Sequence, residues 1–169
     1  KRVIVAEAAH PDTQRTLAAY MRQQDVEIIT APARDGVLDD RALIDLLNRL
    51  LEAERSGVRA VSGMLKPLPD GELKEELKKA KGDEARYVAG LHAALKRLGG
   101  VPSEKVGDFA DKLLVIDGIV ERLRFLNRGQ GWVARKIEAL LPTLTDQAMR
   151  DFFSEMRDTH RKNIAWAEK

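Results

Sequence analysis

The stretch RALIDLLNRLLEAERSGVRAVSGML, residues 41–65, decides the fold, because its apolar residues recur every three or four positions along its whole length. That spacing places them on one side of an α-helix, and such a stripe has to be buried against other elements. One charged residue, Glu54, interrupts the stripe near its middle. The sequence therefore predicts a long amphipathic helix with a carboxylate on its buried face.

Three more segments of the same kind follow. The second helix is expected from a cap at Asp70 to Gly99-Gly100, the third over about 117–141 up to Pro142, and the fourth from just after Thr145 to the C-terminus. The connections within the first and second pairs of helices are short, so each pair should be antiparallel. Each helix spans roughly six or seven turns.

The connection between the second and third helices is longer and is expected to contain a small helix at about 104–113. Two tight helical hairpins joined by one long crossover is the connectivity of ferritin-like bundles. The predicted fold is therefore mainly α, a ferritin-like four-helix bundle over residues 39–169, whose first helix follows the capping residues Asp39-Asp40.

Residues 1–38 have a different character and are expected to form a βαβ appendage. Two short β-branched runs, RVIVA at 2–6 and VEIIT at 26–30, flank a segment with a helical apolar stripe that begins near Pro11. Two parallel strands leave both of their outer edges unpaired. We therefore expect a homodimer that forms through this unit.

Each of the four predicted helices carries one polar residue near the middle of its buried stripe. These residues are Glu54, Glu84, Gln130 and His160, and Tyr87 lies one turn from Glu84. The midpoints of similar antiparallel helices lie at one level, so the four side chains should share a buried layer. Because two buried carboxylates without partners cost several kcal/mol, something must compensate them.

A metal ion is the first candidate. Carboxylates and an imidazole from facing helices are ligands that iron or manganese accepts in a bundle core. The paired Glu-x-x-His signature of a two-iron site is missing, because Tyr87 stands where a histidine is expected and Arg157 where a glutamate is expected. This hypothesis therefore has Glu54, Glu84 and His160 hold a single iron or manganese ion in a divergent metal-dependent oxidoreductase or metal-binding protein.

A metal-free network is the second candidate, and it is the leading hypothesis from the residues alone. In it, arginines neutralise the glutamates while neighbouring polar side chains complete the hydrogen bonds. The arginines considered are Arg86, Arg128, Arg135 and Arg157, and the hydrogen-bonding residues are Tyr87, Gln130 and Asn163. The protein would then be a non-catalytic structural or binding module. A small-molecule pocket lined by the same groups is the third candidate.

Two glycines, Gly129 and Gly131, flank Gln130 inside the third predicted helix. Each costs about 1 kcal/mol there relative to alanine. They predict a close approach by another element or a local bulge at this level of the bundle.

The composition excludes several other classes of protein. The chain of 169 residues has no cysteine, which rules out thiol catalysis, iron–sulfur clusters and thiolate zinc sites. Its 29 basic residues nearly cancel its 27 acidic ones, so no nucleic-acid partner is expected. No apolar run reaches the length of a membrane span and no signal peptide is visible, so we expect a cytoplasmic protein.

Four stretches resemble a bacterial ferritin-like domain family of uncharacterised function, over residues of about 43–164. They are LLEAER at 50–55, DEARY at 83–87, FLNRGQGW at 125–132 and HRKNI at 160–164, the third being the most specific. This resemblance implies a helical bundle with a polar centre, and it brings no activity with it.

Residues 2–43 resemble a βαβ fragment of the glycine dehydrogenase (decarboxylating) P-protein, a pyridoxal-phosphate enzyme. The likeness rests on VAEAAHP at 5–11, VEII at 26–29 and Asp35-Gly36. The large catalytic fold of that family, with its cofactor-binding lysine region, has no counterpart in this chain. We therefore expect neither pyridoxal phosphate nor glycine decarboxylation.

Overall fold

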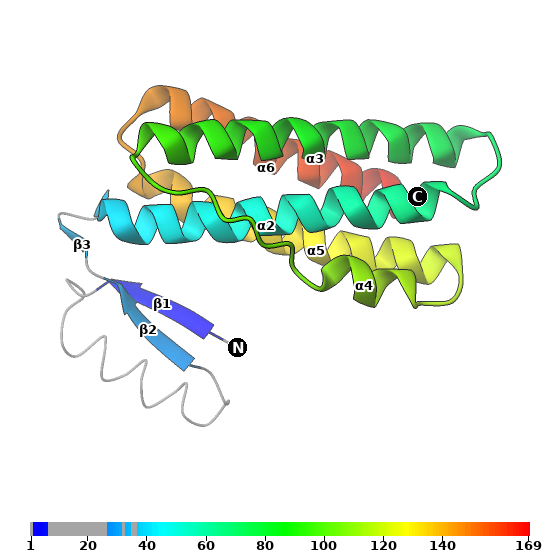
Figure 1. The fold of residues 1–169 in the computed structure, drawn as a ribbon, viewed down its shortest axis with the longest axis horizontal. Coiled ribbons are helices and arrows are strands. Elements are labelled where there is room, and N and C mark those ends of the chain that lie inside the picture. The colour runs from blue at the N-terminus through cyan, green and yellow to red at the C-terminus, as the bar shows by residue number, and fades with distance from the viewer. Residues whose placement is uncertain (1, 7–26, 32, 35–36) are drawn as a thin grey trace.

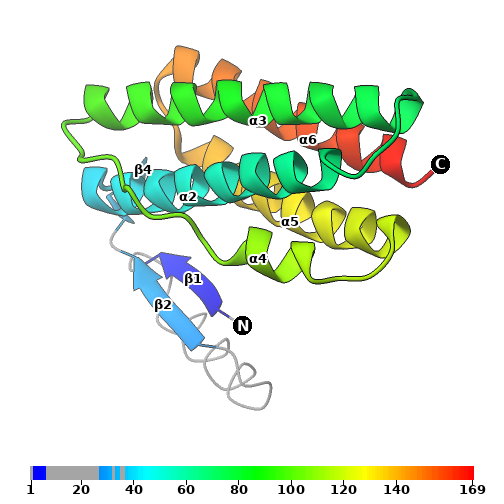
Figure 2. The same ribbon diagram turned by 45° about the vertical axis from the view of Figure 1, so that its right-hand side comes forward.

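A computed structural model of the chain describes residues 2–6, 27–31, 33–34 and 37–169. Four long helices form the bundle: α2 (Asp40–Leu65), α3 (Glu72–Arg97), α5 (Ile119–Leu140) and α6 (Gln147–Ala167). Helix α2 packs along α3 and α5 packs along α6, and the two hairpins lie against each other (Figures 1 and 2). The predicted bundle of two helical hairpins is confirmed.

The crossover between the hairpins runs along α2 and carries the short helix α4 (Phe109–Leu114), which packs on α2 and α5 (Figure 2). The long crossover is thus confirmed, but its helix begins later than the predicted 104–113. A second boundary was also wrong. Asp70 does not cap α3, whose N-cap is Gly71, because the Asp70 carboxylate instead pairs with Lys74 Nζ at 3.0 Å. The cap of α2 is as predicted, since Asp39 Oδ1 accepts from the Ala42 amide at 2.7 Å.

The interior of the bundle contains two apolar clusters. One surrounds Leu47, Leu91 and Phe153, and the other surrounds Val61 and Leu113 where α4 packs against α2. Along α2, Glu54 and Gly57 fall between the residues of the first cluster and those of the second. The middle of the bundle is therefore a polar level between two hydrophobic ones.

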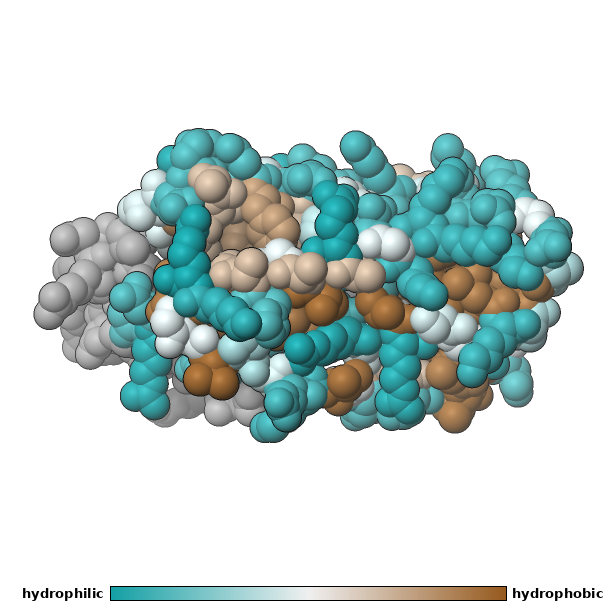
Figure 3. Space-filling model, turned by 45° about the horizontal axis from the view of Figure 1, so that its top comes forward, coloured by the Kyte–Doolittle hydropathy of each residue, from teal (hydrophilic) through white to brown (hydrophobic). Residues whose placement is uncertain are grey.

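The outer faces of the helices are mainly polar, as an amphipathic pattern requires. Figure 3 shows one face, on which hydrophilic side chains surround smaller apolar patches. None of the described helices is both long enough and apolar enough to cross a lipid bilayer.

At the N-terminus, strands β1 (Arg2–Ala6) and β2 (Glu27–Ala31) pair in parallel, with Arg2 opposite Glu27 and Ala6 opposite Ala31. The helix predicted between them falls on residues 7–26, which lie outside the described residues, so the complete βαβ unit stays a prediction. A short antiparallel pair, β3 (Ala33–Arg34) with β4 (Val37–Leu38), follows and was not predicted.

Candidate functional site

One polar side chain from each long helix is buried at the middle of the bundle. Glu54 of α2 and Glu84 of α3 are each 2% exposed, Gln130 of α5 is 4% exposed and His160 of α6 is 1% exposed. Apolar clusters lie on either side of this level. The structure thus brings together four residues that lie far apart in the sequence.

The four side chains make two direct contacts. His160 Nε2 lies 3.2 Å from Glu54 Oε1, and the Gln130 side chain lies near enough to the Glu84 carboxyl group to lower its pKa. The Glu84 carboxylate also lies against the backbone of Gly57, where a Cβ would meet Oε2 at 2.7 Å. A glycine at 57 is therefore what lets Glu84 approach α2 one turn beyond Glu54.

Most of the polar atoms in this layer nevertheless lack partners among the described residues. The buried atoms without a hydrogen bond are Glu54 Oε2, Glu84 Oε2, Gln130 Oε1 and both ring nitrogens of His160. Nε2 of His160 is close to Glu54, but its direction is not that of a hydrogen bond. An unsatisfied buried polar group costs about 1–3 kcal/mol, so a cluster of them calls for a further binding partner.

Burial also changes the acidity of Glu84. Removal from water raises the pKa of its carboxyl group well above the ordinary value, and the nearby negative charge of Glu54 raises this pKa further. The Gln130 side chain opposes both effects. Glu84 therefore keeps its proton to a higher pH than an exposed glutamate does.

The predicted neutralisation of the glutamates by arginine is wrong. No ion pair joins Glu54 or Glu84 to an arginine in the part of the chain that the structure describes. Arg128 and Arg135 are exposed, and the Arg128 guanidinium lies over the Phe125 ring at 4.9 Å. Arg157 pairs with its neighbour Asp158 at 2.8 Å. These long side chains reach water from the bundle surface, where a charge is far cheaper to keep than in the core.

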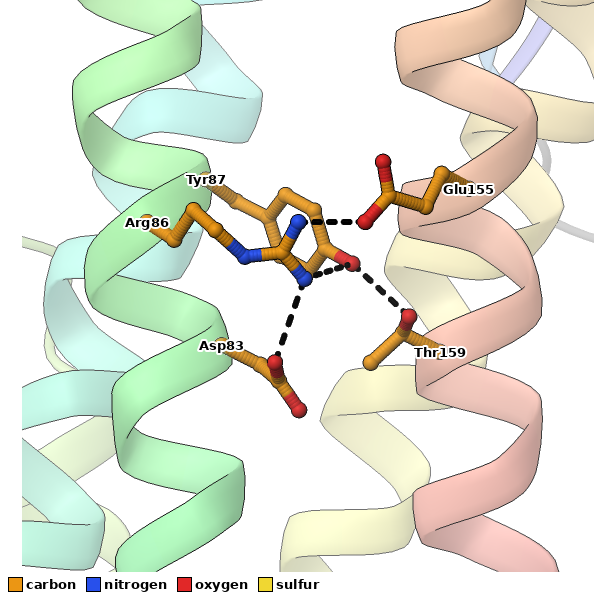
Figure 4. Close-up of polar contacts among 5 residues, drawn as sticks. All are labelled: Asp83, Arg86, Tyr87, Glu155 and Thr159. Carbon is orange, nitrogen blue, oxygen red and sulfur yellow. Dashed lines mark hydrogen bonds and ion pairs between the residues drawn. The ribbon is translucent and has the colours of Figure 1, made fainter.

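Tyr87 is fully buried, but its hydroxyl serves a different group of residues (Figure 4). It donates to Thr159 Oγ1 at 2.8 Å and accepts from Arg86 Nη2 at 3.1 Å. Arg86 also binds Glu155 and lies 3.2 Å from Asp83 Oδ1. Tyr87 touches the polar layer only through its ring, whose centroid is 5.8 Å from that of His160. Its predicted hydrogen bonding to the glutamates is wrong.

Asn163, one turn after His160, is the remaining predicted member of the network. Its side chain is half-buried, and its Nδ2 atom is buried without a hydrogen-bond partner. No described hydrogen bond joins it to the other four residues. The network predicted from the sequence thus reduces to Glu54, Glu84, Gln130 and His160.

A cavity of about 530 Å³ borders this layer. Its walls come from α2, α5, α6, α3 and the crossover, and they include Arg49, Glu52, Ala53, Phe109, Leu126, Arg128, Trp132 and Val133 in addition to the four buried polar residues. Gly129 explains how α4 reaches this wall. A Cβ there would meet the Phe109 ring at 2.6 Å, so the close approach predicted from the glycines is confirmed, with α4 as the approaching element.

The hydrogen bonds that hold the crossover against α2 beside the cavity were not predicted from the sequence. Ser56 is fully buried; its hydroxyl donates to the Gly107 carbonyl at 2.9 Å and accepts from the Ala110 amide at 3.1 Å. The adjacent small residues Ser56-Gly57 were the available signal, because a pair of small residues on a buried stripe marks close approach by other elements. The place of Arg49 in the cavity wall was not predicted either, because its sequence position is that of an ordinary exposed helix residue.

The chemistry of this donor set suits a hard cation, although its geometry is incomplete. Within the described residues, no three His, Asp or Glu side chains are grouped closely enough to hold a metal ion as they stand. Glu54 and His160 do form a suitable pair. Two donors that bind one ion at roughly 2.1 Å and at about a right angle lie about 3 Å apart, close to the 3.2 Å observed.

Comparison with solved structures confirms the fold. The bundle is similar to a chain from Bacillus anthracis described as a ferritin-like, diiron-carboxylate protein, with a TM-score of 0.62 and 18% sequence identity. The match covers 77% of this chain and 93% of that one. At this level of identity the likeness shows the fold alone, which is a ferritin-like bundle.

Comparison with curated proteins gives two short matches. Both are described as probable glycine dehydrogenase (decarboxylating) subunit 1, from Coprothermobacter proteolyticus, 46% identical over 48 residues, and from Lysinibacillus sphaericus, 40% identical over 48 residues. Each match covers 28% of this chain and 11% of the relative. The chain therefore spans about a tenth of the length of these relatives, and only a short segment is shared.

The bundle itself matches one family over its whole length. The model of the family described as a domain of unknown function, DUF6306, matches residues 41–169, from the start of α2 to the last residue. The chain therefore belongs to the DUF6306 family.

Proposed function

We propose that this protein is a metal-binding ferritin-like bundle that holds one divalent cation, iron or manganese, between Glu54, Glu84 and His160. The observation that carries the proposal is the cluster of buried polar atoms without partners at the middle of the bundle. Their cost to stability is recovered when a ligand satisfies them together.

The identity of the unpartnered atoms favours a cation. Glu54 Oε2, Glu84 Oε2 and Gln130 Oε1 are oxygens with free lone pairs, and a neutral His160 ring offers one nitrogen lone pair. Oxygen and imidazole donors suit iron and manganese. In this arrangement Gln130 supplies a neutral fourth oxygen, and Glu84 releases its proton when the ion enters.

The positions of the arginines support the same conclusion. The metal-free network predicted from the sequence relied on arginines at this level, and the described arginines pair elsewhere or reach solvent. Within the described residues two carboxylates occupy the layer, whereas carboxylate two-iron sites in helical bundles use about four. The proposal is therefore for a single ion, even though the structural neighbour from Bacillus anthracis is described as a diiron-carboxylate protein.

The test is a metal analysis of the full chain purified without chelators, followed by titration of the metal-free protein with Mn²⁺ in a calorimeter. We expect one ion per chain, and Glu84→Gln and His160→Ala should each weaken Mn²⁺ binding by at least about tenfold. Glu75→Gln is the matched control, because Glu75 is an exposed carboxylate on the same helix that pairs with Lys78.

Two results would overturn the proposal. Purified protein without iron or manganese that also binds no added Mn²⁺ or Fe²⁺ would leave the non-catalytic, metal-free module as the better account. Binding that survives unchanged in both layer variants would place the ion elsewhere.

A further inference from the structure

The cavity beside the polar layer is much larger than a single metal ion needs. Its volume of about 530 Å³ lies within the range of roughly 300–1,000 Å³ that is typical of small-molecule sites. Phe109, Leu126, Val133 and Trp132 give it apolar walls, and the buried polar layer forms part of its lining. A molecule with an apolar body would fill space that the metal leaves empty.

The charged residues in the walls bear on whether such a molecule is an anion or a cation. Besides the buried layer, two acidic residues line the cavity. Asp108 Oδ2 lies 2.6 Å from Lys112 Nζ, which offsets its charge. Glu52 accepts from Ser103 Oγ at 2.5 Å, which satisfies its carboxylate but leaves it negative.

The two arginines in the walls are differently placed. Arg49 on α2 and Arg128 on α5 are both exposed, and neither takes part in an ion pair or hydrogen bond among the described residues. The guanidinium of Arg128 lies over the face of the Phe125 ring. The cavity therefore combines apolar walls with positive charge from two helices that has no acidic partner in the described part of the chain.

We infer that the cavity binds a small organic carboxylate, whose charged group pairs with Arg49 and Arg128 and whose apolar body packs against Phe109 and Leu126. Guanidinium groups bind carboxylates through paired, charge-assisted hydrogen bonds. Burial of the apolar body against the walls supplies the rest of the affinity. This site goes beyond the proposed metal site and does not require a metal to be bound.

The test uses octanoate as the probe, with 1-octanol as the same apolar body without the charge. Calorimetric titration of the full chain should give one octanoate per chain, with 1-octanol at least about tenfold weaker. Arg49→Gln and Arg128→Gln should each weaken octanoate binding by about three- to tenfold. Added salt should weaken octanoate and leave 1-octanol unchanged.

A matched control is Arg135→Gln, which removes an exposed arginine of α5 that does not line the cavity and should leave octanoate binding unchanged. The inference is overturned if octanoate does not bind, if octanoate and 1-octanol bind equally, or if both wall variants bind as the parent does. Inorganic phosphate that binds as tightly as octanoate would also overturn it, because the apolar walls would then contribute nothing.

Mn²⁺ titration of the same arginine variants separates this inference from the metal proposal. If the protein binds octanoate through the arginines but binds no Mn²⁺, only the metal proposal is contradicted. If the protein binds Mn²⁺ normally but binds no octanoate, only the proposed carboxylate site is contradicted.

Discussion

The carboxylate of Glu84 on α3 lies directly against the backbone of Gly57 on α2, so that a Cβ at position 57 would come within 2.7 Å of Glu84 Oε2 and 2.8 Å of Oε1. Gly57 follows Glu54 by one helical turn. The two buried glutamates therefore meet at neighbouring turns of α2, and a single missing methyl group makes this arrangement possible.

Gly57→Ala is expected to weaken Mn²⁺ binding by at least about tenfold while leaving the fold intact. The new Cβ would clash with the carboxylate at the far end of the Glu84 side chain, and Glu84 can relieve the clash by changing its rotamer. Alanine also gains up to about 1 kcal/mol of helix propensity over glycine, which offsets part of the strain. The measurements are Mn²⁺ calorimetry and denaturant unfolding, with the free energy of unfolding expected within about 1 kcal/mol of the parent.

Gly82→Ala is the control for that variant. Gly82 lies in the middle of α3 with nothing within 4 Å of its would-be Cβ. This substitution should stabilise the protein by about 0.5–1 kcal/mol and leave Mn²⁺ binding unchanged. Equal Mn²⁺ affinities in the Gly57 and Gly82 variants would contradict the role assigned to the Gly57 contact.

Glu84→Gln is expected to change the pH dependence of stability in the metal-free protein. Burial and the negative charge of Glu54 raise the pKa of Glu84 well above its ordinary value, so the folded chain holds this proton more tightly than the unfolded chain does. The contribution of Glu84 to stability is therefore fully present below about the unfolded pKa, and it is lost as pH rises through the higher folded pKa.

The glutamine variant removes that loss, because it stays neutral and can hydrogen bond with Gln130. We expect it to be about 1–3 kcal/mol more stable than the parent at high pH, with the difference shrinking toward pH 4. Urea unfolding of both proteins across this pH range measures the difference. A variant that is less stable than the parent at every pH would refute the assignment of a strained, buried carboxyl group.

The buried layer was predictable because the residues that make it break a regular pattern. Glu54, Glu84, Gln130 and His160 each interrupt an apolar stripe near a helix midpoint, and the two-hairpin connectivity places those midpoints at one level. Periodicity thus identified both the bundle and the residues buried at its centre.

The partners of that layer were not predictable in the same way. Arg86, Arg128 and Arg157 lie close in sequence to the layer, but which way a long side chain leaves a helix depends on the surrounding surface. The cavity depends on the path of the crossover, which the Ser56 hydroxyl and the space above Gly129 determine. These contacts join segments that are distant in the sequence, so no local sequence pattern predicts them.

The homodimer stays a prediction that a mass measurement can decide. Among the described residues, strands β1 and β2 form a parallel sheet of two strands, and so small a sheet is marginal in water without further pairing or cover. Light scattering on the full chain should give twice the mass of 18.9 kDa at micromolar concentrations. A chain without residues 1–38 should give a monomer with unchanged helical circular dichroism, and a monomeric full chain would contradict the prediction.

Tyr87→Phe tests whether the tyrosine hydroxyl belongs to the α3–α6 contact or to the buried layer. Its hydroxyl joins Arg86 to Thr159, and its ring packs near His160 in either case (Figure 4). The variant should lose about 1 kcal/mol of stability, and it should bind Mn²⁺ as the parent does because phenylalanine keeps the ring.

The partner of that hydroxyl can be checked with Thr159→Val in a double-mutant cycle. If the hydrogen bond between the two side chains is the interaction that is lost, the coupling energy should be about 0.5–1.5 kcal/mol in unfolding experiments. Independent effects of the two substitutions would show that no such bond forms. A large loss of Mn²⁺ affinity in Tyr87→Phe would instead place the hydroxyl at the metal and would require the tyrosine to turn away from Thr159 when the ion binds.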